Sequence, residues 1–160
     1  MKVDIVLADK GSANPHAGTL NLLNVGWSVT TLNPGQGGAA PLTPPHAVAV
    51  FFEVELHRCN QPLQMVVELV TEDGETVQVP TPNGEQPLHI EQTVTVSPPA
   101  GAPIGSPGHG NTLIEMAPGL PLAPGTYRWE VSMDQERKSE WTASFHVRPP
   151  QQQPVIGLGN

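Results

Sequence analysis

Apolar and polar residues alternate along most of the chain, and the alternation is strictest near the C-terminus. Between positions 126 and 133 every second residue is apolar, and these residues are Tyr127, Trp129, Val131 and Met133. Successive side chains of a strand point to opposite faces, so this pattern predicts a strand with one buried and one solvated face. Trp141, Ala143, Phe145 and Val147 repeat the pattern. We predict an antiparallel hairpin over the polar turn 134–138, with both apolar rows on one core.

The same period of two predicts strands in the first two thirds of the chain. Apolar rows occupy alternate positions in 3–7, 48–56, 63–69 and 88–96, and the turn pair Asp73-Gly74 precedes a short strand in which Val77 and Val79 point inward. No window of ten or more residues shows a persuasive helical period. We therefore predict roughly nine short strands and an all-β fold, a single Ig-like antiparallel β-sandwich with long Pro/Gly loops.

The pattern of residues 19–31 predicts a further strand, but its apolar residues change from even-numbered to odd-numbered positions within the strand. Leu20 and Leu22 are in phase before the slip, and Leu23, Val25 and Trp27 are in phase after it. A slip of one residue exchanges the two faces of a strand. Either a bulge lies at this point or both faces are covered, and Trp27 is the tryptophan whose exposure most needs testing.

Three segments rich in proline and glycine interrupt the pattern: 33–46, 97–110 and 148–160. Proline removes a backbone donor and glycine weakens a strand, so these segments are predicted to be irregular or extended. We divide the chain into one sandwich domain, 1–147, and an extended C-terminal tail, 148–160. Val155, Ile156 and Leu158 are apolar residues within this tail. They are predicted to bind a protein partner by adding to a sheet edge, the alternative being that the tail folds back on its own domain.

Composition restricts the partners. The formal net charge is −8, from 7 Lys and Arg against 15 Asp and Glu. Such a chain repels phosphate, which argues against nucleic acid and against anionic membranes. The only cysteine, Cys59, cannot form an internal disulfide. The first nine residues are too short an apolar run for a signal peptide, and Asp4 breaks that run, so synthesis in the cytosol without export is expected.

Candidate chemical sites are weak. His46, His57 and His109 occur in or beside loops and could converge with a carboxylate, but solvated loop histidines are the favoured interpretation. Cys59 has a basic neighbour, Arg58, that could activate its thiol, and an inert loop cysteine is the favoured alternative. The sequence contains no metal-ligand spacing and no nucleophile motif. We predict no enzymatic activity, no cofactor and no metal.

The segment 122–129 carries the most specific local pattern. A Pro-Gly pair at 124–125 delivers Tyr127 to the start of a strand, and Trp129 follows on the same face. This is typical of the tyrosine corner of Ig-like sandwiches, in which the hydroxyl bonds to upstream backbone. Tyr127 and Trp129 therefore serve as markers of the fold.

Several segments resemble a family of small, functionally uncharacterised proteins of actinobacteria, other bacteria and tailed phages. The resemblance rests on the opening Met-Lys-Val-Asp-Ile-Val-Leu-Ala-Asp and on segments 18–27, 45–50, 67–74 and 122–129. It spans about residues 1–147 and implies a single Ig-like sandwich. It implies no functional residue, because the family has no established site.

Two functions are compatible with these features. The first is a structural protein of a tailed-phage virion, either a capsid decoration or a head-to-tail component, that binds a large protein particle in many copies. The second is a bacterial cytosolic module that binds a protein or small ligand through its loops. The fold alone does not choose between them.

Overall fold

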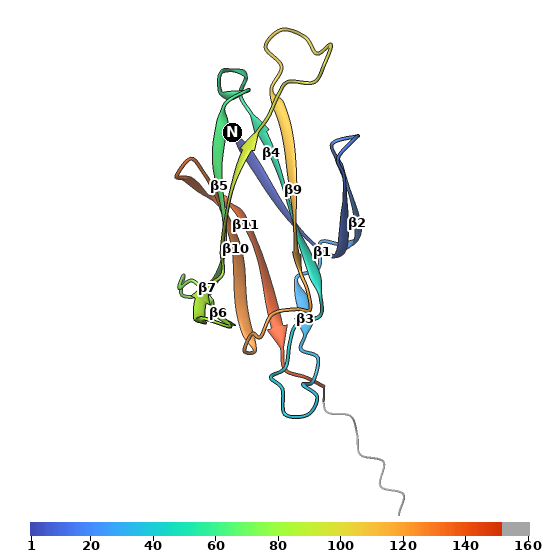
Figure 1. Cartoon of the computed structure of the whole chain (residues 1–160), viewed down its shortest axis with the longest axis vertical. Coiled ribbons are helices and arrows are strands. Elements are labelled where there is room, and N and C mark those ends of the chain that lie inside the picture. The colour runs from blue at the N-terminus through green and yellow to red at the C-terminus, as the bar shows by residue number, and fades with distance from the viewer. Residues whose placement is uncertain (152–160) are drawn as a thin grey trace, which may run out of the picture.

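The computed structural model describes residues 1–151 and shows an all-β sandwich (Figure 1). These residues contain no α-helix and one 3₁₀ turn, η1 (Leu56–Arg58). The eleven strands are β1 (Lys2–Asn14), β2 (Thr19–Val25), β3 (Val29–Thr31), β4 (His46–Val54), β5 (Pro62–Thr71), β6 (Gln78–Thr81), β7 (Gly84–Pro87), β8 (His89–Thr95), β9 (Gly108–Met116), β10 (Gly125–Met133) and β11 (Glu136–Arg148).

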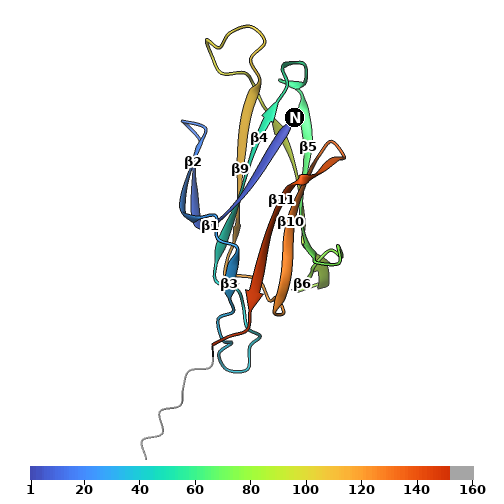
Figure 2. The same ribbon diagram turned by 180° about the vertical axis from the view of Figure 1, so that it is seen from behind.

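Two sheets form the sandwich. Sheet A has the strand order β2-β1-β4-β9, and sheet B has the order β3-β11-β10-β5-β8. All pairs in these sheets are antiparallel except β3 and β11, which are parallel. The two sheets face one another along the long axis of the molecule, as both Figure 1 and the reverse view in Figure 2 show. Strands β6 and β7 form a separate ribbon beside sheet B.

The predicted apolar rows form the core between the sheets. Its largest fully buried side chains include Trp129, Trp141, Phe145, Leu63, Met65, Leu69, Met133, Val48 and Val50. Burial of a large apolar side chain contributes about 1.5–3 kcal/mol, so these rows dominate the stability of the fold. Leu56, predicted at the end of the β4 row, is instead exposed in η1, because the chain turns there towards β5.

The C-terminal hairpin is confirmed, with a turn shorter than predicted. β11 begins at Glu136, so only Asp134 and Gln135 connect the strands, and both have positive φ. Two residues with positive φ give the backbone twist that a tight hairpin requires. The Asp134 carboxylate also accepts hydrogen bonds from Gln64 N at 2.8 Å and from Arg58 Nη2 at 2.5 Å, which ties the turn to β5 and η1.

The hydrogen bond predicted for the Tyr127 hydroxyl, to backbone upstream of it, is present. The hydroxyl donates to the carbonyl oxygen of Ala123 at 2.9 Å, and the ring stacks on Phe145 with centroids 5.9 Å apart. Trp129 follows on the same face and is fully buried. The bond fastens the loop before β10 to the core.

The prediction that 97–110 is irregular throughout was wrong at its end, and β9 was missed. β9 begins at Gly108 and pairs along all of β4, from His46 opposite Met116 to Val54 opposite Gly108. Its glycines are required by close packing, because a Cβ at Gly110 would lie 2.4 Å from Cε2 of Phe52. Glycine usually weakens a strand, although at Gly110 it permits β9 to approach the ring of Phe52.

The predicted strand 19–31 is two strands in different sheets, and both explanations of its phase slip were wrong. β2 pairs with β1 in one continuous register, and Leu23 and Val25 are 59% and 55% exposed. β1 leaves its partner β4 after Ala8 and continues with β2 alone. Residues 8–25 thus form a two-stranded arm, which stands off beside β9 in Figures 1 and 2. The apolar pattern shifts because Leu23 and Val25 lie on a face of the arm that is exposed among the described residues, 1–151.

β11 ends at Arg148, next to the predicted domain limit. The tail residues Val155, Ile156 and Leu158 lie outside the described residues, so the prediction that they bind a partner remains a prediction.

Candidate functional site

The three loop histidines do not come together. His46 and His109 lie at opposite ends of the β4–β9 pair, where their partners are Met116 and Glu53, and His57 lies in η1. Within residues 1–151 no group of three or more His, Cys, Asp or Glu side chains is placed to hold a metal ion. Likewise, no helix in this part of the chain is long and apolar enough to span a membrane.

Cys59 is a buried structural residue. It is 7% exposed, and its thiol faces the carbonyl oxygens of Val54 at 3.7 Å and Glu55 at 3.6 Å. A Cβ at Gly108 would lie 2.9 Å from its sulfur, so β9 closes over it. Reactive thiols need solvent access, and this geometry favours the inert interpretation.

Trp27 and His46 form a buried aromatic cluster with Phe145 where β3 enters sheet B. Trp27, whose exposure was in question, is half-buried and meets His46 edge-on, with ring centroids 5.6 Å apart. His46 Nδ1 donates to the carbonyl oxygen of Pro44 at 3.1 Å, which leaves Nε2 as a buried acceptor without a partner among the described residues. Burial lowers the pKa of His46 below 6.5, against opposing contributions from Pro44 and Asp9.

A network of charged side chains crosses the outer face of sheet B. It runs over Glu91, His89, Glu68, Arg137, Glu130 and Arg128. Glu68 and Glu130 are direct cross-strand partners, and Arg137 bridges them at 2.6 Å and 3.0 Å. Hydrogen bonds to Glu91 and then Glu68 raise the pKa of His89 above 6.5. The network fixes strand register and presents no open carboxylate pair for acid-base catalysis.

The two histidines are expected to give opposite pH dependences of stability. The folded state disfavours charging of His46, so its contribution is lost as the pH falls below 6.5 towards the folded pKa. The folded state favours charged His89, so its contribution is complete below 6.5 and is lost as the pH rises through the folded pKa. Urea unfolding from about pH 5 to about pH 8 measures both effects. We expect His46→Phe to reduce the fall of the free energy of unfolding as the pH is lowered from 6.5. We expect His89→Gln to reduce its fall as the pH is raised above 6.5. A variant that lowers stability equally at every pH contradicts the assignment for that residue.

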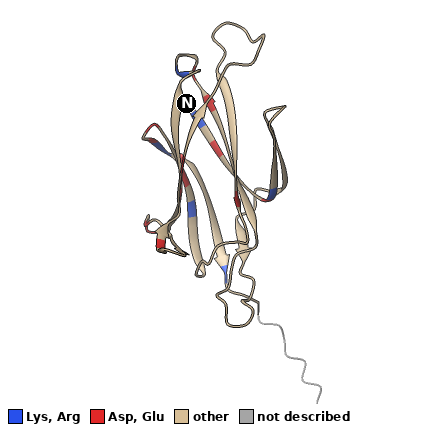
Figure 3. Ribbon diagram, in the orientation of Figure 1, with Lys and Arg blue, Asp and Glu red and all other residues tan. Residues whose placement is uncertain are grey.

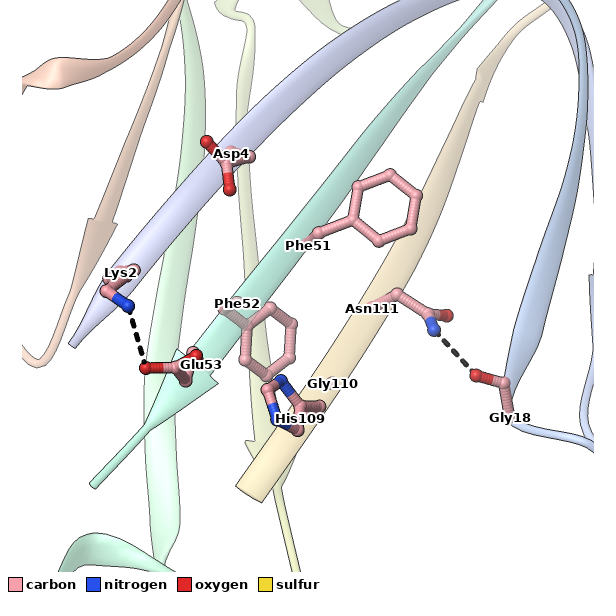
Figure 4. Close-up of a pocket in the computed structure, with 9 residues that line it drawn as sticks. All are labelled: Lys2, Asp4, Gly18, Phe51, Phe52, Glu53, His109, Gly110 and Asn111. Carbon is pink, nitrogen blue, oxygen red and sulfur yellow. Dashed lines mark hydrogen bonds and ion pairs between the residues drawn. The ribbon is translucent and has the colours of Figure 1, made fainter. Parts of the chain in front are cut away.

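A concave surface lies on the outer face of sheet A (Figure 4). It is a groove of about 240 Å³ between β1, β4, β9 and the tip of the arm. Its lining residues are Lys2, Asp4, Gly18, Phe51, Phe52, Glu53, His109, Gly110 and Asn111. Apart from His109, no residue of this groove was predicted from the sequence to form a site, since the lining residues are distant in the chain.

Strand register places the groove residues in two rows. Asp4, Phe51 and Asn111 are cross-strand partners in the first row, and Lys2, Glu53 and His109 are partners in the second. Direct partners in an antiparallel sheet have Cβ atoms about 4.5–5.5 Å apart, so each row acts as one surface. Two of these residues give a signal in the sequence: Phe51 is an aromatic residue on the solvent side of the β4 alternation, and His109, one of the three loop histidines, is paired here with the carboxylate residue Glu53.

The arm closes one side of the groove. Asn111 Nδ2 donates to the carbonyl oxygen of Gly18 at 2.7 Å, which fastens the tip of the arm to β9. Midway along the arm, a Cβ at Gly11 would lie 2.6 Å from Cδ1 of Leu113, so the backbone packs directly on that side chain. The arm is therefore held in place while its outer face remains open.

The most exposed large apolar side chains lie in the arm and in the loop before β9, and Val29 and Leu56 are exposed elsewhere. Leu23 and Val25 are exposed on β2, and Ile104 is fully exposed in the loop 97–107. This loop contains no charged residue, and Figure 3 shows it free of the blue and red that mark charges elsewhere. Exposed aliphatic residues on edges and loops are typical of contact surfaces.

Comparison with known proteins does not assign this site. No family model matches the chain, and no curated protein matches it.

Proposed function

We propose that this protein is a non-enzymatic assembly protein that binds a protein partner through the outer edge of the arm. The observation that carries the proposal is the exposure of Leu23 and Val25 on β2, which is an edge strand of sheet A. An edge strand has unpaired backbone donors and acceptors that can bind a strand of another chain. Edges that must stay free usually carry charge or proline, and β2 (Thr-Leu-Asn-Leu-Leu-Asn-Val) carries neither.

The energetics support binding at this edge. Burial of a fully exposed valine or leucine side chain contributes about 1.5–3 kcal/mol. Leu23 and Val25 are 59% and 55% exposed, so a contact over both can gain somewhat more than half of that value for each, which exceeds the value of about 0–1 kcal/mol for an exposed ion pair. A single arm makes a small contact. A particle with many copies compensates for weak individual contacts, because each bound copy adds to the total.

The particular role that we propose is that of a virion accessory protein of a tailed phage, a capsid decoration or a head-to-tail component. This role is supported by the resemblance of residues 1–147 to a family that occurs in tailed phages. The virion role itself remains a prediction. The protein partner is then a large oligomeric particle, and the acidic net charge of −8 disfavours contact with the packaged nucleic acid.

The arm is tested by charge insertion. We expect Leu23→Asp and Val25→Asp to abolish co-sedimentation of the protein with particles in a density gradient of the producing lysate, because a buried unpaired charge opposes docking. Thr95→Asp is the matched control, since Thr95 is exposed on β8, the edge strand of the other sheet. Circular dichroism of all three variants verifies the fold.

The gradient has two informative outcomes. Wild-type protein found with particles, and lost from them in the two arm variants alone, supports the proposal. Wild-type protein recovered only as a free species of 17.0 kDa contradicts the virion role. That result favours the alternative, a bacterial cytosolic binding module, for which the groove on sheet A is the specific supporting observation.

A further inference from the structure

We infer that the groove between the arm tip and the outer face of sheet A binds the guanidinium group of an arginine side chain of a protein partner. The inference deepens the proposed function, because it names the chemistry of a second contact with the partner. It is carried by the groove of about 240 Å³ and by the row Asp4, Phe51 and Asn111 (Figure 4).

The acceptors of this row are a carboxylate and a side-chain carbonyl. Asp4 has an exposed carboxylate, and no ion pair or hydrogen bond joins it to the other groove residues in Figure 4. Asn111 donates one of its two amide N–H groups to the carbonyl oxygen of Gly18, and its own side-chain carbonyl oxygen is an acceptor. The ammonium group of Lys2 is paired with Glu53 at 3.2 Å. A guanidinium group has five donors and no acceptor, so it complements such a surface.

Phe51 supplies the second requirement of a guanidinium site. Its partly exposed ring lies between Asp4 and Asn111 across the three strands. The face of an aromatic ring attracts a cation, and the planar guanidinium can stack on the ring while its edge bonds to a carboxylate. The ammonium of a lysine can use only the charge and not the stacking, which is why the groove favours arginine.

The charge of the groove also favours a cationic ligand. The groove contains two carboxylates, Asp4 and Glu53, and one ammonium, Lys2, so the acidic side chains of its lining outnumber the lysine by one. The whole chain carries a net charge of −8, which attracts cationic partners and repels anionic ones. An anionic ligand is therefore disfavoured at this site by both the local and the overall charge.

The test uses the full chain and the probe Nα-acetyl-arginine N-methylamide. Backbone amide NMR shifts follow the titration, with the corresponding citrulline derivative as a neutral probe of nearly the same shape. We expect shifts confined to residues of the groove, with weak affinity because the probe lacks the rest of the partner. We also expect about tenfold weaker binding of the citrulline derivative, which keeps the shape and loses the charge.

Two variants assign the roles of the row. Asp4→Asn is expected to weaken arginine binding about tenfold, because the amide removes the charge and one acceptor. Phe51→Leu is expected to weaken it about threefold by removing the aromatic face. Asp73→Asn is the matched control for charge, since Asp73 is exposed in the turn between β5 and β6, and it should bind as the wild type does.

Several results would overturn the inference. Equal binding of the arginine and citrulline probes would exclude charge as the determinant, and undiminished binding by Asp4→Asn would exclude the carboxylate. Shifts centred elsewhere would remove the site. The arm variants Leu23→Asp and Val25→Asp are expected to bind the probe normally, so failure of arm docking and failure of the arginine site are separate results.

Discussion

Replacement of Trp129 by alanine is expected to lower the free energy of unfolding by about 3–5 kcal/mol. Trp129 is fully buried on β10, between the neighbouring strands β5 and β11 of sheet B. Removing the indole loses its transfer free energy and leaves a cavity that strands fixed by ladder hydrogen bonds cannot close. Equilibrium unfolding in urea, followed by circular dichroism, measures the loss.

Trp129→Phe separates the packing of the ring from its polar atom. The indole Nε1 is buried and has no hydrogen-bond partner among the described residues. Phenylalanine keeps an aromatic ring and removes this unsatisfied donor, so we expect a loss of only about 1–2 kcal/mol. If both variants lose the same free energy, the ring itself contributes nothing and the central role of Trp129 in the core is wrong.

The second large effect is expected at Gly119, where alanine should cost about 3 kcal/mol from backbone strain and steric overlap together. Its φ is +125°, a conformation that residues with a Cβ rarely adopt, and an added Cβ would lie 2.0 Å from the carbonyl oxygen of Thr43. Thr43 is fully buried, and its hydroxyl oxygen accepts a hydrogen bond from Leu120 N at 2.9 Å. The two loops therefore cannot separate to relieve the overlap without breaking that bond.

Gly101→Ala is the matched control for this prediction. Gly101 has a φ of +77°, and a Cβ there would meet nothing within 4 Å. Its substitution tests backbone strain without overlap, and we expect a loss of about 1 kcal/mol or less in an exposed loop. Urea unfolding of both variants gives the comparison. Equal losses at the two positions would show that contact with Thr43 is unimportant.

The core of this protein could be predicted from its sequence because strand amphipathicity is a local property. Side chains two residues apart share a face, so the row from Tyr127 to Met133 identifies its buried side without knowledge of its partners. The hydrogen bond of the Tyr127 hydroxyl is equally local, since it joins residues four positions apart. Sequence patterns of this range survive in the fold because no distant contact competes with them.

The strand pairings and both surface sites could not be predicted in this way. β9 was missed because Gly108 and Gly110 make room for the side chains of Cys59 and Phe52, which lie some fifty residues earlier in the chain. The exposure of Leu23 and Val25 depends on where β1 parts from β4, and apolar residues on a strand otherwise predict burial. The groove joins residues of β1, β4 and β9 that become neighbours only through register.

The all-β class, the buried rows of the core and the hydrogen bond of Tyr127 follow from the amino-acid sequence, because each depends on the alternation or spacing of neighbouring residues. Three further features are set by the three-dimensional fold: residues 19–31 divide between two sheets, Leu23 and Val25 are exposed among the described residues, and Asp4, Phe51 and Asn111 line one groove. These features arise from pairing between strands distant in sequence, and the energy of such pairing depends on the register and packing of the whole sheet.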